Sequence, residues 1–565
     1  MAETSETLAR AHSCLEEGAF GEAIQLLSTL TDAGGDDGFD AALLLGRTLI
    51  AAGRLPEAIE ALQKALAMAA GDGSRTARVF VLIAVASDRL GAEADAAYLL
   101  EQALELDASL IEARTISARL HARAGRFEEA EAVLAPALAA APADEAPALA
   151  QAMVMAEAGR LEAAKAVLED LLHRHPESGE ALANLGNVLR DLGLRKKSRE
   201  HFDAALEVLP PPSSDYARAR VNRAMVRFIQ GDFAGGWADY EFRLRLPEAR
   251  STEGLPPPFR GARGDACGMR LLVYPEQGIG DIVMFATLLP ELAGIGADIR
   301  FWAPERLLDL FTRSLDGITV EPDPGAAQQG EHAGNAEASL ALGSVGRLLR
   351  PLRRNFNGRG PRPHAPLLKA DPERVAHWAA RLEEMGPRPH VGMSWRGGAT
   401  NWDRSLRHTE PADWRALFAD RGMTLVSLQF GASADEVRDF GAGAGGTLHH
   451  VENVGEDADD LTAVIAALDG VVSMDNSTVH FAGALAQPTV TLVPHVPTWR
   501  WGEAEDTSLW YPTMRIVRNE AEPDGPGAWA EAIAQAAALL PTLMERDKAA
   551  RHGAAQDWNM EARDV

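Results

Sequence analysis

The most constraining feature of this chain is a glycine that recurs every 34 to 38 residues between positions 18 and 231. The glycines are Gly18, Gly53, Gly91, Gly125, Gly159, Gly193 and Gly231. Five positions after each stands a small residue, and four further on a larger apolar one. The small residues are Ala23, Ala58, Ala96, Ala130, Ala164, Ser198 and Gly236, and the larger ones are Leu27, Leu62, Leu100, Leu134, Leu168, Phe202 and Tyr240. A glycine that ends one helix with a positive φ, followed by a small residue that lets the next helix pack closely, predicts stacked helix pairs.

Prolines close several of these units, at Pro142, Pro176 and Pro210. A period near 34 residues with this order of small residue, large residue and proline resembles the tetratricopeptide repeat. We therefore expect an α-solenoid of about seven units over residues 1–247. Its concave surface is expected to hold an extended or helical segment of a partner protein, although a merely solvated face fits the pattern equally well. The aromatic residues of the last unit, Trp237, Tyr240 and Phe242, are expected to pack against the following domain.

The second half of the chain alternates apolar strands with helical stretches. The strands are expected at Met269–Tyr274, Asp298–Ala303, Ile318–Glu321, Ala338–Leu342, His390–Trp395, Met423–Gln429, Gly470–Met474, Thr489–Pro494 and Met514–Val517. Such alternation predicts parallel sheets covered by helices. We expect a proline- and glycine-rich linker over 248–268, two Rossmann-like α/β subdomains over 269–370 and 371–545, and a tail over 546–565. Ligands of such folds bind beyond the carboxyl ends of the strands.

Charge and composition exclude several classes of function. The chain has 82 acidic and 55 basic residues and a formal net charge of −27, which makes it a poor binder of nucleic acid or an anionic membrane. Its acidic excess is strong in residues 1–150 and absent from 151–250. No apolar run approaches the roughly 18 residues of a membrane span, and the N-terminus reads as neither a signal peptide nor an anchor. Cys14 and Cys267 match no disulfide framework or metal motif, so we expect a cytoplasmic protein.

Two loops that follow strands carry candidate binding residues. Glu276–Asp281 contains Gly278 and Gly280, which let a ligand approach the backbone, and Asp281, whose alternative role is to cap the next helix. Trp395–Arg407 contains Arg404 and Arg407, which suit a phosphate or carboxylate. The alternative for these arginines is pairing with Asp403 and Glu410.

A third loop, Asp475–His480, follows a strand and opens a helix. Asp475, Asn476, Ser477 and Thr478 are ordinary helix-capping residue types, and the same groups with the helix dipole make a phosphate seat. The chain has no HExxH, paired-cysteine or P-loop motif. Its glycine loop also departs from the dinucleotide fingerprint, because position 283 is Val.

The second half resembles the GT-B glycosyltransferases related to bacterial heptosyltransferases, and the whole chain resembles bacterial proteins that fuse tetratricopeptide repeats to such a domain. Its layout is also similar to that of protein O-linked N-acetylglucosamine transferase. The stretches that carry the resemblance are Gly231–Arg243, Glu276–Asp281 with Phe285, Trp395–Arg407, Ser427–Gln429, Ala466–Asp475, His480–Ala486, Trp499–Trp501 and Trp510–Pro512.

The resemblance implies roles for individual residues. Asp281 stands where heptosyltransferases place a general base, and Arg407, assisted by Arg404, where they place a cation on the donor phosphate. The remaining donor-site candidates are Asp475, Asn476, Ser477 and His480, which match an Asp-Thr-Gly-x-x-His motif, and Gln429 and Arg500. Asn476 and Ser477 depart from the Thr-Gly of that motif, which leaves their phosphate contacts open.

This chain resembles in layout some members of the repeat-fused group in flagellated alphaproteobacteria, which are flagellin glycosyltransferases. The resemblance therefore implies transfer of a nonulosonic acid, of pseudaminic or legionaminic type, from a CMP-activated donor to Ser or Thr of flagellin held by the repeats. No cofactor and no metal are expected. One alternative is a UDP- or GDP-hexose donor. Another is a non-catalytic scaffold or chaperone with a degenerate GT-B half.

Overall fold

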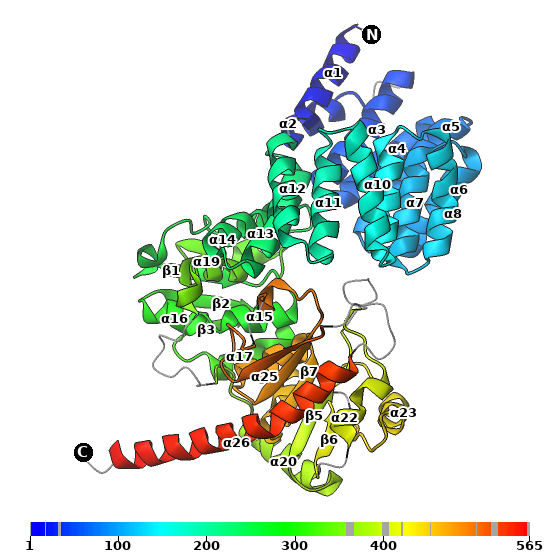
Figure 1. Cartoon of the computed structure of the whole chain (residues 1–565). Coiled ribbons are helices and arrows are strands. Elements are labelled where there is room, and N and C mark those ends of the chain that lie inside the picture. Colours follow the sequence, from blue (N-terminus) through cyan, green and yellow to red (C-terminus); the bar gives the residue numbers. More distant parts are fainter. Residues whose placement is uncertain are drawn as a thin grey trace. The chain divides into compact units, whose positions relative to one another are not determined.

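The computed structural model describes residues 2–16, 19–31, 35–356, 366–397, 406–419, 422–452, 454–503, 506–520 and 529–561. The chain forms two compact units (Figure 1). The first unit consists of Met1–Arg223 and Phe242–Ala249, and the second contains Ala224–Glu241 and nearly all of the chain from Arg250 onward.

The first unit is an α-solenoid of paired helices. The helices are α1 (Ala2–Glu16), α2 (Phe20–Ser28), α3 (Gly35–Ala51), α4 (Leu55–Met68), α5 (Gly73–Arg89), α6 (Glu93–Leu106), α7 (Ile111–Arg123), α8 (Phe127–Ala140), α9 (Glu145–Glu157), α10 (Leu161–Arg174), α11 (Gly179–Asp191), α12 (Arg195–Val208) and α13 (Ser214–Ile229). Five of the periodic glycines, from Gly53 to Gly193, lie in the turns that join paired helices, each with a φ between +73° and +82°. The predicted repeat architecture is confirmed.

The repeat signature explains the packing between helices. Ala58, Ala96, Ala130, Ala164 and Ser198 are fully buried, and so are the larger residues four positions later. At Gly186 of α11, an added Cβ would lie 2.9 Å from the ring of Phe202 in α12, so this helix pair needs glycine for its close approach. Small residues and Leu or Phe therefore form a series of local cores between neighbouring helices along the stack.

The end of the repeat array belongs to the second unit. Helix α14 (Phe233–Tyr240) and the second half of α13 pack their aromatic residues into the α/β core rather than onto the preceding repeats. Trp237 and Tyr240 behave as expected, since both contact Trp499. Phe242 does not, because its ring packs against Tyr216 of the first unit. The first compact unit therefore runs to Arg223 and also includes Phe242–Ala249, so the division between the units falls within the last predicted repeat.

The second unit contains two parallel sheets, as predicted. The first sheet has the order β3–β2–β1–β4, from β1 (Arg270–Tyr274), β2 (Asp298–Ala303), β3 (Thr319–Pro322) and β4 (Ala338–Ala341). The second has the order β6–β5–β7–β8–β9, from β5 (His390–Ser394), β6 (Thr424–Ser427), β7 (Gly470–Met474), β8 (Thr489–Val493) and β9 (Met514–Arg518). Every strand pair is parallel.

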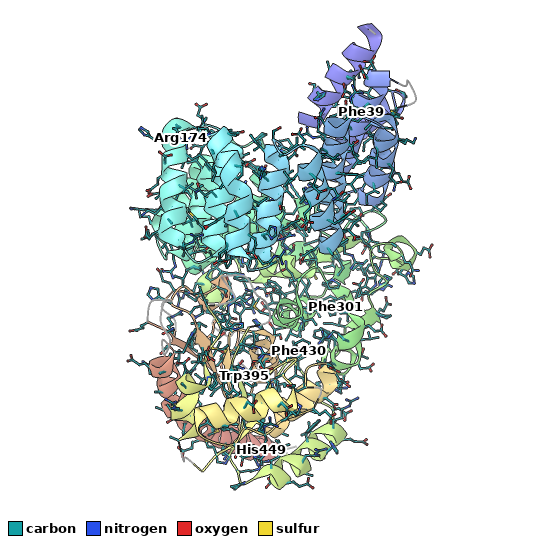
Figure 2. All side chains as sticks on the ribbon, turned by 90° about the vertical axis from the view of Figure 1, so that its right-hand side faces the viewer. Phe39, Arg174, Phe301, Trp395, Phe430 and His449 are labelled. Carbon is teal, nitrogen blue, oxygen red and sulfur yellow. The ribbon has the colours of Figure 1, made fainter. Side chains whose placement is uncertain are left out.

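Helices pack around both sheets and supply the rest of the core. Those of the first subdomain are α15 (Ile279–Ala286), α16 (Leu289–Gly294), α17 (Leu308–Ser314), α18 (Gln329–His332) and α19 (Val345–Leu349). Those of the second are α20 (Pro372–Met385), α22 (Arg415–Phe418), α23 (Ala434–Ala444), α24 (Ala458–Ala467), α25 (Ser477–Ala484) and α26 (Ala530–Glu561). Helix α26 continues without a break through residue 546, where the sequence predicted a tail. Phe301 of β2 is fully buried against Phe311 of α17, and Figure 2 labels it.

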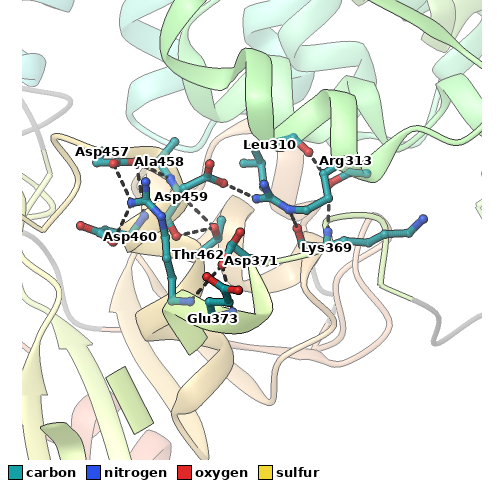
Figure 3. Close-up of polar contacts among 12 residues, drawn as sticks. Leu310, Arg313, Lys369, Asp371, Glu373, Asp457, Ala458, Asp459, Asp460 and Thr462 are labelled. Atoms are coloured by element: carbon teal, nitrogen blue, oxygen red, sulfur yellow. Dashed lines mark hydrogen bonds and ion pairs between the residues drawn. The ribbon is translucent and has the colours of Figure 1, made fainter. Parts of the chain in front are cut away.

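Polar contacts join the two subdomains at one edge (Figure 3). Arg313 of α17 pairs with Asp459 in the first turn of α24 and also donates to the Lys369 carbonyl over 2.7 Å. Asp371 caps α20 by accepting from the backbone N–H groups of Glu373 and Arg374. These contacts hold the segment between the two sheets against both of them.

Candidate functional site

The three candidate loops all follow strands at the switch points of the two sheets. In the first sheet, β1 lies between β2 and β4, so the order of the strands reverses beside β1, and Glu276–Asp281 follows β1. In the second sheet the switch lies between β5 and β7, which are followed by the loops that begin at Trp395 and Asp475. Ligands of open α/β sheets bind at these points. Topology therefore selects the same loops that sequence selected.

Asp281 and Arg500 form an ion pair that connects the two subdomains. Asp281 lies in the first turn of α15, and Arg500 lies in the short 3-10 helix Trp499–Trp501 that follows β8. The Nε and Nη2 atoms of Arg500 donate to the same Oδ1 of Asp281, over 2.8 and 2.5 Å. The guanidinium also lies 5.0 Å from the ring centroid of Trp499. Asp281 is not a helix cap, because the N-cap of α15 is Gly278.

The first turns of α15 and α25 touch at Gly280. A Cβ at this glycine would lie 2.8 Å from the His480 ring and 3.5 Å from the Ser477 Cα. Glycine is therefore required by the contact between the two helices. Two helix N-termini placed side by side concentrate positive potential, which favours an anion. Gly278, by contrast, is exposed and has open space where a Cβ would stand.

His480 is a buried imidazole held by two aromatic residues. Its Nδ1 lies 3.0 Å from the Tyr511 hydroxyl, and its ring stacks on Trp501 at 5.7 Å between centroids. Burial, reinforced by the charge of Arg500, lowers the pKa of His480 to about 4, although Asp281 and Asp475 oppose this shift. Burial also raises the pKa of Tyr511, so a neutral phenol faces a neutral histidine.

Because of this arrangement, protonation of His480 at low pH destabilises the folded protein. Since an unfolded histidine has a pKa of about 6.5, stability is present above that pH and is lost as the pH falls towards about 4. Between about pH 7.5 and about pH 4.5, the wild type should lose about 3 kcal/mol more unfolding free energy than His480→Gln, which cannot titrate. Urea unfolding at both pH values measures the difference. Equal losses in the two proteins would show that His480 is not a buried neutral base.

Asp475 and Arg407 form the second charged pair of the site. Arg407 Nη1 lies 3.9 Å from Asp475 Oδ2 and donates to the Asp475 carbonyl over 3.4 Å. The Thr498 hydroxyl donates to the same carboxylate over 3.4 Å. Arg407 thus pairs across the switch point of the second sheet rather than with Glu410. Arg404, like Asp403, lies outside the described residues.

The side-chain amides of Asn476 and Gln429 form hydrogen bonds within the protein. Asn476 caps α25 by accepting from the Thr478 N–H, and its Nδ2 donates to Ser394 Oγ over 2.7 Å. Gln429 Oε1 accepts from Ser394 Oγ and from the backbone N–H groups of Trp395 and Arg396. Both amides bind the backbone directly after β5, at Arg396; Trp395, the residue before it, is labelled in Figure 2. Ser477 is exposed at the first position of α25, whereas the Thr478 side chain is buried.

The residues that support this site lie in stretches that carry the family resemblance, but the sequence alone assigned none of them a role. Trp499 lies beneath Arg500, Tyr511 binds His480, and Glu276 accepts from the Gly343 N–H over 2.8 Å, which ties the ends of β1 and β4 together. The Trp-Arg-Trp triplet was a usable signal, since two large aromatic residues around one arginine indicate a guanidinium held in place. No comparable pattern indicated that Tyr511 would be the hydrogen-bond partner of His480.

Comparisons with known proteins identify the repeats. Family models described as tetratricopeptide repeat match residues 15–78 and 149–217. The chain thus carries an N-terminal solenoid with tetratricopeptide repeats, followed by a C-terminal region with two parallel sheets. It is 28% identical over 386 residues to Protein FlbA of Caulobacter vibrioides, a match that covers 66% of this chain and 63% of that protein.

Solved structures also have similarity to parts of the chain. One is a tetratricopeptide repeat protein from Parabacteroides merdae, with 15% identity, a TM-score of 0.34, and coverage of 43% of this chain and 92% of that one. Another is PilF of Pseudomonas aeruginosa, with 19% identity, a TM-score of 0.29, and coverage of 37% and 91%. In the part of the chain that the structure describes, every helix is too short or too polar to cross a bilayer.

Proposed function

We propose that the α/β region is a metal-independent glycosyltransferase of the GT-B type and that the repeats hold its protein acceptor. The observation that carries this proposal is the meeting of the loop after β1 with the loops after β7 and β8, which brings Asp281, Arg500 and His480 together. A site that joins two such sheets suits a reaction in which each sheet binds one reactant. Two arginines in an acidic chain, both at this site, favour a phosphate-bearing donor.

In the proposed reaction, Asp281 accepts the proton of a Ser or Thr hydroxyl of the acceptor. The hydroxyl oxygen forms a bond to the anomeric carbon, and the bond from that carbon to the donor phosphate breaks. The electron pair leaves with the nucleoside phosphate. Arg407, Arg500 and the N-terminus of α25 stabilise the charge on that phosphate. The donor proposed first is a CMP-activated nonulosonic acid and the acceptor proposed first is flagellin, both on the strength of the family resemblance.

A non-catalytic scaffold is the second candidate, and one observation favours it. Asn476 and Gln429, both donor-site residues by resemblance, are committed to hydrogen bonds within the protein. A repeat protein that binds nucleotide without transferring sugar would tolerate the engagement of these two amides within the protein. It would still present the solenoid to a partner protein.

Reconstitution with purified components separates these possibilities. The chain is incubated with flagellin and, in separate reactions, with CMP-pseudaminic acid, CMP-legionaminic acid, and UDP- and GDP-hexoses, and the acceptor is then weighed intact. Addition of a nonulosonic acid supports the proposed donor. A hexose increment moves the assignment to a UDP or GDP donor. Nucleotide binding in calorimetry with an unmodified acceptor under every donor favours the scaffold.

A further inference from the structure

Two arginines and two carboxylates alternate through the candidate site. Arg407 pairs with Asp475, and Arg500 pairs with Asp281. Although burial opposes the charged form of Arg500, the charges of Asp281 and Asp475 raise its pKa. Each cation that the proposed donor phosphate needs therefore has a carboxylate beside it.

The contact geometry shows which atoms compete. Arg500 uses its Nε and Nη2 atoms on Asp281, and these two N–H groups form one of the edges of guanidinium that bind phosphate in a bidentate manner. The side chains of both residues are largely buried, with 21% and 15% of their surfaces exposed. A phosphate that binds this edge must displace the carboxylate, because one edge does not serve two anions.

The surroundings favour an anion at this place. The first turns of α15 and α25 meet at Gly280 and Ser477, beside the ion pair. Asp281 already benefits from the first of these N-termini, and a phosphate bears more charge than a carboxylate. Trp499 holds the guanidinium from its other side, so Arg500 can change its anion without leaving its position.

From these contacts we infer that the Asp281 carboxylate occupies the edge of Arg500 to which the donor phosphate binds. A phosphate ester that binds there displaces the carboxylate from the guanidinium. This inference rests on the proposed function and deepens it. The exchange releases the Asp281 carboxylate, so the proposed base is free to take a proton once the donor has bound. Donor binding then precedes activation of the acceptor hydroxyl, and the inference assigns Arg500 to both steps.

Calorimetric titration with CMP, UDP and GDP tests the exchange without any transfer reaction. Asp281→Asn removes the competing charge at nearly the same volume, and we expect it to bind the preferred nucleotide about tenfold more tightly than the wild type. Arg500→Ala should bind about tenfold or more weakly. In the Arg500→Ala background, Asp281→Asn should have no further effect, because the arginine for which they compete is gone.

Each outcome has a separate meaning. Equal or weaker binding by Asp281→Asn overturns the exchange and leaves a nucleotide-dependent function standing. The same gain in the Arg500→Ala background also overturns it, because the gain would then be a general effect of charge. If none of the three nucleotides binds to any variant, both the exchange and the proposed function fail. If the Asp281→Asn and Arg500→Ala variants bind nucleotide as expected but the wild type transfers no sugar, the exchange is supported and only the transferase activity is rejected.

Discussion

Asp281→Ala is expected to transfer sugar about 100- to 10,000-fold more slowly than the wild type, which is the usual contribution of a general base. The reason is geometric as well as chemical. Asp281 is the carboxylate of the first subdomain that reaches Arg500 of the second, so it lies where the reactants of both sheets would meet. The measurement is single-turnover transfer at saturating donor, so that donor affinity does not enter the rate.

Asp459→Ala is the matched control for this variant. Asp459 also lies in the first turn of a helix and also pairs with an arginine of the other subdomain, Arg313. It therefore reproduces the loss of an ion pair between the subdomains while Asp281 is kept. We expect its rate to stay within about threefold of the wild type, since this ion pair lies outside the loops of the candidate site and takes no part in proton transfer. A normal rate in Asp281→Ala, or an equal defect in Asp459→Ala, would remove the base assignment.

Trp237→Ala is expected to destabilise the second unit by about 3 to 5 kcal/mol, the cost of deleting a large buried aromatic side chain. Trp237 is 1% exposed, lies 4.5 Å from the Phe228 ring between centroids, and donates from Nε1 to the Arg350 carbonyl over 2.8 Å. Its ring fills the space above Gly346, where an added Cβ would lie 2.3 Å from it. The variant leaves a cavity and an unpaired carbonyl in one core.

Urea unfolding followed by tryptophan fluorescence measures this loss, and Tyr98→Ala provides the control. Tyr98 is an aromatic residue of α6 that is 61% exposed, so its removal should change the unfolding free energy by less than about 0.5 kcal/mol. Should Trp237→Ala unfold at the same urea concentration as Tyr98→Ala, the last repeat would not be part of the α/β core.

The sequence predicted those parts of the fold that repeat or alternate locally. The bounds of β2 and β7 agree with the expected strands to the residue, because short apolar runs between turn residues are a local signal. The repeat glycines were equally readable, since a left-handed turn requires a residue without a Cβ. The end of the array was predictable only in part, because the aromatic residues of the last unit indicated contact with the following domain, whereas only the burial of α14 shows that it belongs to the α/β core.

The candidate site was predictable residue by residue but not as an arrangement. Asp281 and Arg500 are 219 positions apart, and no local pattern pairs a helix start with a distant aromatic triplet. For helix-capping residues, the position was clear from the sequence but the role was not. Asn476 looks the same in sequence whether it binds a phosphate or, as here, the Ser394 hydroxyl and the Thr478 N–H. Contacts between loops decide such cases, and spacing along the chain does not.

The most direct test of the central claim is the intact mass of flagellin co-expressed with this chain and with the host's nonulosonic acid pathway. The claim predicts flagellin heavier by one or more whole nonulosonic acid residues with the wild-type chain, and unmodified flagellin with Asp281→Ala. Flagellin of unchanged mass beside an active pathway and a folded wild-type chain would contradict it. So would equal modification by the wild type and Asp281→Ala.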